Sequence, residues 1–90
     1  MSMLTTVKTA KRIKHSQLDD EIKRHIQTAK AELIRMGVDE DVVKDDGSLI
    51  TEAVVTFCLA RLEQDLKLKQ EYQEAFRIQA DQIRRSKNVQ

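Results

Sequence analysis

The chain has 90 residues, of which 40% are hydrophobic and 34% charged, with no proline and two glycines. This composition is typical of a helical protein, because strand-rich folds need more aromatic and turn residues. The net charge of +1 supports neither a nucleic-acid binder nor a surface that seeks acidic partners. We expect one all-α domain over residues 1–90, with a small core and with frayed ends at 1–4 and 86–90.

The first two predicted helices cover about Thr5–Ile13 and the segment that follows Ser16. Thr5 or Thr6 is the expected N-cap of the first helix, and Ser16 that of the second, where Asp19 completes a capping box. The apolar residues of the second helix share one face at the helical period, and Gly37 is its expected C′ residue. The residues of that face are Leu18, Ile22, Ile26, Ala29, Leu33 and Met36.

The next segment, Val38–Gly47, is predicted to be a connection with at most one helical turn, and it ends in the turn signal Asp46-Gly47. Ser48 or Thr51 then caps a third helix, which runs to about Leu66 and is apolar on two opposite sides. A small core uses one apolar stripe per helix, so the second stripe needs cover from more of the same chain or from a neighbouring subunit. One stripe holds Leu49, Ala53, Phe57 and Ala60, and the other, the predicted subunit or partner interface, holds Val55, Leu59, Leu62 and Leu66.

A fourth helical pattern follows, and Glu63–Gln70 before it contains neither glycine nor proline. The pattern therefore fits a separate helix or a continuation of the third as one long rod. The expected fold is a bundle of about four helices, the third central and two-faced and the fourth extended if the rod is continuous. The fourth pattern consists of Tyr72, Ala75, Phe76, Ala80 and Ile83.

Basic residues gather near both ends of the chain, whereas acidic residues gather in the middle. Such charge runs are usually solvated surface, and the alternative is contact with nucleic acid or an acidic partner protein. The candidates for such contact are Lys8, Lys11, Arg12, Lys14, Arg84 and Arg85.

The sequence offers no catalytic constellation, and we expect no metal, cofactor or small-molecule substrate. His15 and His25 lack nearby cysteines and do not make a zinc site, and the acidic stretch 39–47 fails the ligand spacing of a calcium loop. The single cysteine, Cys58, is expected to be buried and inert, and it permits no internal disulfide. The apolar-rich stretch Leu49–Leu62 is too short to span a bilayer, so we expect a soluble intracellular protein with no membrane contact.

The segment from Val7 to Ile22, followed by Ile26 and Ala29–Leu33, resembles the opening of tailed-phage head–tail connector proteins. These are also called head-completion, adaptor or DNA-packaging proteins. In that family a short N-terminal helix ends in an Arg-Ile-like pair, and a polar turn and an acidic pair, here Asp19-Asp20, come next. A helix with isoleucines on two turns, an acidic loop and a strongly apolar helix such as Ile50–Leu62 continue the resemblance, which covers about residues 4–61.

The resemblance implies a helical subunit of a phage or prophage that assembles into a homo-oligomeric ring under the portal protein. It implies a structural protein of the virion, present in the host cytoplasm during assembly, that completes the head after DNA packaging. The ring would extend the DNA channel, contact the passing DNA without reading its bases and carry the head-closure or tail protein. Many relatives have a glycine-containing turn where this chain has Glu63–Glu71, so we transfer no portal-contact residue to the C-terminal segment.

The alternative hypothesis is a small helical DNA-binding regulator. The basic N-terminus and the helical content permit it, but no predicted helix pair has the tight glycine turn of a helix-turn-helix. An enzyme is disfavoured because the catalytic ingredients are missing.

Overall fold

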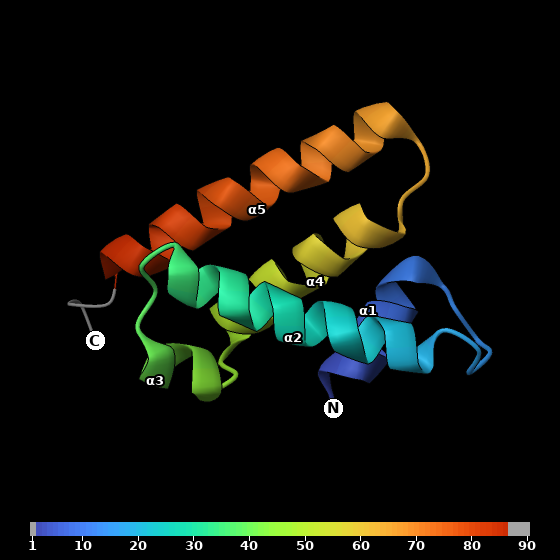
Figure 1. Cartoon of the computed structure of the whole chain (residues 1–90), viewed down its shortest axis with the longest axis horizontal. Helices are drawn as coiled ribbons and strands as arrows, with labels where there is room; N and C mark the ends of the chain where they lie inside the picture. Colours follow the sequence, from blue (N-terminus) through green and yellow to red (C-terminus); the bar gives the residue numbers. More distant parts are fainter. Residues whose placement is uncertain (1, 87–90) are drawn as a thin grey trace.

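The structure is a computed structural model that describes residues 2–86. Figure 1 shows that this part of the chain is all-α, as predicted, although it has five helices and not four. The fraying predicted for residues 1 and 87–90 concerns positions outside the described residues, whereas Met3 and Leu4 lie in the first helix. The helices are α1 (Met3–Lys11), α2 (Asp19–Arg35), α3 (Glu40–Lys44), α4 (Ser48–Leu62) and α5 (Leu66–Ser86).

Helices α1 and α2 begin at other caps than predicted. The hydroxyl of Ser2 accepts the Thr5 N–H at 3.1 Å, so α1 starts before Thr5. The N-cap of α2 is Leu18, which makes no side-chain capping bond, and Ser16 contributes only its carbonyl, which accepts the Asp19 N–H at 3.2 Å. The predicted capping box is therefore wrong, because the chain makes a backbone turn before α2.

The apolar face of α2 and its glycine stop are confirmed. Ile22, Ile26, Ala29 and Leu33 are buried, and the outer two residues of the predicted face are half-buried against the core. Gly37 has φ 104°, and the following N–H, of Val38, donates to the Leu33 carbonyl at 3.0 Å. This pattern closes the end of a helix and needs the positive φ that glycine tolerates best.

The connection after α2 contains the single turn of helix α3. The Asp39 carboxylate caps α3 by accepting the Asp41 N–H at 2.8 Å, and Val43, a residue of α3, is buried in the core. Asp46 then takes a left-handed conformation, with φ 54°. The N-cap of α4 is Gly47, not Ser48 or Thr51 as predicted.

The break between α4 and α5 settles the question of the long rod in favour of two helices. The Asp65 carboxylate accepts the Leu68 N–H at 3.0 Å, which supplies a cap for the start of α5. The Lys69 Nζ donates to the Ala60 carbonyl at 2.8 Å and so satisfies an acceptor in the last turn of α4. Helix α5 then folds back along α4 (Figure 1), with which it makes its most extensive contacts.

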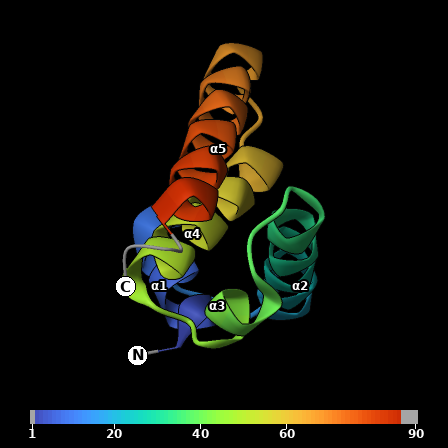
Figure 2. The same cartoon turned by 90° about the vertical axis from the view of Figure 1, so that its left-hand side faces the viewer.

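Helix α4 is central, because α1, α2 and α5 all pack against it, as the end-on view of Figure 2 also shows. No helix among residues 2–86 is both long enough and apolar enough to span a membrane. The buried residues of α4 are Ile50, Ala53, Val54, Cys58 and Ala60, and α5 adds Phe76, Ala80 and Ile83.

Candidate interaction surfaces

The predicted interface stripe of Val55, Leu59, Leu62 and Leu66 is divided by the fold. Val55 and Leu62 are partly buried against the hydrophobic core, and Leu59 is half-buried. Leu66 is 67% exposed but belongs to α5, beyond the break. Helices α1, α2 and α5 pack against α4, so the same chain supplies part of the cover for its second stripe, which is one of the two alternatives that the sequence left open. A subunit contact through these four residues stays a prediction.

Large apolar side chains are exposed at single positions on α2, α4 and α5. Leu49 is 56% exposed at the start of α4, and it was placed in the other stripe by the sequence. The sequence did not single out the other exposed apolar residues, because they lie outside the faces that repeat at the helical period. Exposure of single apolar residues is common on soluble proteins. The others are Ile34, Leu68 and Ile78.

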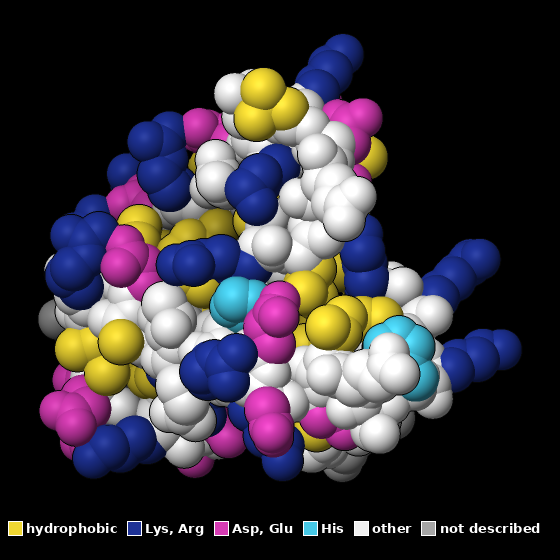
Figure 3. Space-filling view, turned by 45° about the vertical axis from the view of Figure 1, so that its right-hand side comes forward, with side chains coloured by type: hydrophobic (Ala, Val, Ile, Leu, Met, Phe, Trp, Pro, Cys, Tyr) yellow, Lys and Arg dark blue, Asp and Glu magenta, His cyan; other side chains and the backbone are white. Residues whose placement is uncertain are grey.

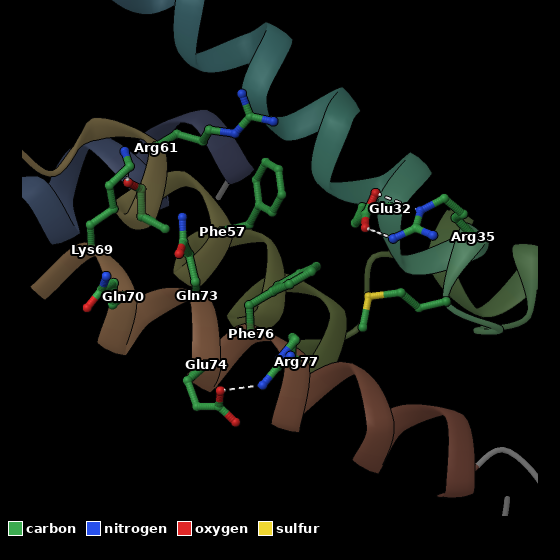
Figure 4. Close-up of a pocket in the computed structure, with 12 residues that line it drawn as sticks. Glu32, Arg35, Phe57, Arg61, Lys69, Gln70, Gln73, Glu74, Phe76 and Arg77 are labelled. Atoms are coloured by element: carbon green, nitrogen blue, oxygen red, sulfur yellow. Dashed lines mark hydrogen bonds and ion pairs between the residues drawn. The ribbon is translucent and has the colours of Figure 1, made fainter. Parts of the chain in front are cut away.

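A groove of about 820 Å³ opens between α2, α4 and α5 (Figure 4). Its apolar lining includes Phe57 and Phe76, whose rings meet edge to face with centroids 5.1 Å apart. Such pairs contribute about 0.5–1.5 kcal/mol beyond area burial. The sequence placed both aromatic residues on apolar faces, but it did not show that the two faces meet at an open groove.

Charged side chains surround this apolar lining. Arg61 lies over the Phe57 ring, with its guanidinium carbon 5.0 Å from the ring centroid. Arg77 pairs with Glu74 at 2.5 Å, and Arg35 donates hydrogen bonds from Nε and Nη2 to the two carboxylate oxygens of Glu32. Hydrogen bonding from Arg35 lowers the pKa of Glu32, and the charges of Arg35 and Arg61 lower it further. Figure 3 shows hydrophobic side chains in a hollow of the surface, with Lys and Arg side chains around it.

Four of the six basic residues predicted to contact nucleic acid or a partner are held by carboxylates of the same chain. Lys8 pairs with Asp19 at 2.7 Å, and Lys11 pairs with Glu63 at 3.0 Å. Arg84 and Arg85 both pair with Asp81, at 2.5 and 2.9 Å.

The remaining two, Arg12 and Lys14, are exposed and make no ion pair within residues 2–86. Arg12 and Lys14 follow α1, whereas Arg84 and Arg85 lie in the last turn of α5. Figure 1 places these two segments at opposite ends of the longest axis. The fold therefore does not unite the six residues into one basic surface.

The groups with reactive chemistry are dispersed. Cys58 is buried, and desolvation raises the pKa of its thiol to about 12. His25 lies 3.4 Å from Glu21, and the His15 Nδ1 accepts the Gln17 N–H. Across the described range, no three His, Cys, Asp or Glu side chains are grouped so as to hold a metal ion.

The family model described as phage connector protein matches residues 3–90, so the chain belongs to that family. This match confirms the resemblance found in the sequence. Because the family is one of structural proteins, the match supports a structural role in phage assembly. Searches of curated proteins and of solved structures gave no match.

Proposed function

We propose that this chain is a ring-forming connector that docks below the portal and completes the phage head after DNA packaging. The family match over residues 3–90 carries the proposal. The neighbours of the ring would be the portal protein on one side and a head-closure or tail protein on the other. The work is geometric: each copy binds its neighbours and extends the channel, with no chemical turnover.

The structure supports a subunit with several different contact surfaces. The groove between α2, α4 and α5 and the exposed start of α4 differ in charge, because cations dominate the lining of the first and Asp41 and Asp45 stand beside the second. Unlike surfaces make head-to-tail contacts, which close into rings when the rotation between copies permits. Of the six basic residues predicted to contact nucleic acid, Arg12 and Lys14 are the two that no carboxylate of the described chain holds, so we propose them for contact with DNA in the channel. Such contact would be sequence-independent and would weaken with salt.

The test uses DNA-filled heads of the encoding phage or prophage from which this chain has been genetically removed. Purified wild-type chain is added, and its copies per head and the protection of packaged DNA from nuclease are measured. We expect several copies at a single vertex and restored DNA retention. Absence of binding to portal-bearing heads would refute the proposal.

Base-specific binding is measured in parallel with a gel-shift assay on phage DNA fragments. Tight binding to one sequence, together with no binding to heads, would favour the DNA-binding regulator. No contact in the structure favours that alternative over the connector.

A further inference from the structure

The groove between α2, α4 and α5 carries an excess of positive charge. Four cationic side chains and two carboxylates line it. Each of these two carboxylates is paired with an arginine, as described above. Of the four cations in the groove, Arg61 and Lys69 therefore have no carboxylate partner among the described residues. We call this surface the basic groove; its lining used in the argument is Arg35, Phe57, Arg61, Lys69, Phe76 and Arg77.

The segment 39–49 has the opposite character, and we call it the acidic turn. Five carboxylates and one lysine lie between residues 39 and 48, and residues 44–49 are all exposed. Asp41 and Asp45 make no ion pair within residues 2–86, whereas Asp46 pairs with Lys30 at 2.9 Å. Beside them, Leu49 exposes 56% of its surface. The acidic turn therefore presents an apolar side chain next to unpaired carboxylates.

No residue of the acidic turn lines the basic groove, although the end of α2, with Arg35, lines the groove and leads into the turn. Figure 1 shows α3 at the lower left, whereas the part of α5 that lines the basic groove, residues 69–77, lies at the upper right. A copy of the chain therefore does not fill its own groove with its own acidic turn.

We propose that the acidic turn of one copy docks into the basic groove of the next. Leu49 covers the half-exposed ring of Phe57, and the carboxylates of Asp41 and Asp45 face the cations of the groove. Opposite charges across such a contact set its register and speed the encounter. Because the contact joins two different patches, it repeats from copy to copy. The proposal deepens the ring function and rests on it for the closed geometry, since the contact alone would also allow an open chain.

The test exchanges charges between the two surfaces. The groove variant carries Arg61→Glu and Arg77→Glu, and it keeps Lys69 because the ammonium of that residue holds the end of α4. The turn variant carries Asp41→Lys and Asp45→Lys. A control variant, Arg24→Glu with Lys67→Glu, changes the net charge as much as the groove variant does, at exposed positions outside both surfaces.

Self-association is measured by sedimentation over a range of protein concentrations at low salt, after circular dichroism has verified that each variant is helical. The wild type and the control are expected to associate alike. Each charge variant alone should associate roughly 10- to 100-fold more weakly, because like charges then face each other. An equimolar mixture of the groove and turn variants should recover association, since every contact in it again joins opposite charges. Raising the salt should weaken association of the wild type.

Three results would overturn the proposal: a wild type that stays monomeric, variants that associate like the control, or a mixture that fails to recover. If the wild type is monomeric and the groove variant alone loses binding to heads, the groove receives a segment of a head protein and not a second copy. Binding of the wild type to portal-bearing heads is measured separately. A failed charge exchange with intact head binding therefore refutes only this contact, and a successful exchange without head binding refutes only the connector function.

Discussion

Leu62→Ala and Leu66→Ala form a matched pair that shows whether the predicted interface stripe stabilises the fold. Leu62 packs partly buried against the core, whereas Leu66 is 67% exposed at the start of α5. A fully buried Leu→Ala substitution costs about 2–5 kcal/mol, so half of that contact predicts a loss of about 1–2.5 kcal/mol at Leu62. An exposed substitution of the same kind should change the free energy of unfolding by at most about 0.5 kcal/mol.

The assay is urea unfolding followed by far-ultraviolet circular dichroism, with thermal unfolding as a second measure. A domain of this size loses about 4–8 °C of Tm per kcal/mol, so Leu62→Ala should melt roughly 4–20 °C lower and Leu66→Ala close to the wild type. Equal stability of the two variants would refute the assignment of Leu62 to the core. If Leu62→Ala were as stable as the wild type but failed to assemble, the interface prediction from the sequence would be correct.

Three further perturbations test local features of the fold. Gly37→Ala should cost about 1–2 kcal/mol in urea unfolding, because the φ of 104° is unfavourable for a residue with a Cβ. Cys58 should react with a thiol reagent at mildly alkaline pH only after unfolding, because burial raises its pKa to about 12; rapid labelling of the native chain would contradict this. Hydrogen bonds from the Asp65 N–H and from Lys11 lower the pKa of Glu63, so its stabilisation exists above the unfolded pKa and is lost as the pH falls below the ordinary glutamate value of about 4.3. Glu63→Gln should therefore flatten the acid limb of the stability profile, and an unchanged profile would argue against these contacts.

The sequence predicted the fold best where one strong period coincided with a strong stop. In α2 the period of 3.6 and Gly37 together defined both the buried face and the end of the helix. The caps were predicted less well: Ser2 caps α1 in place of Thr5 or Thr6, and α2 begins after Leu18 although Ser16 has a suitable side chain, because the path of the chain decides which residue meets the free N–H groups. The sequence allowed one helical turn between Val38 and Gly47 but did not define its bounds, because a single turn such as α3 is too short to show a period.

The break after α4 was hidden by the absence of glycine and proline. It is made by Asp65, whose carboxylate caps α5, and an aspartate three residues before Leu68 was the available signal. The sequence left a separate helix and a continuous rod both open, so it could not show that α5 folds back to cover part of α4. The basic groove could not be predicted for the same reason: it exists only because the return of α5 brings Phe76 next to Phe57.

The most direct test of the connector function is an electron cryomicroscopy reconstruction of the portal vertex in mature particles of the encoding phage or prophage. We predict a ring of copies of this chain immediately below the portal, around the DNA channel, between the portal and the next closure or tail protein. Particles whose portal contacts that next protein directly, with this chain elsewhere or missing, would contradict it.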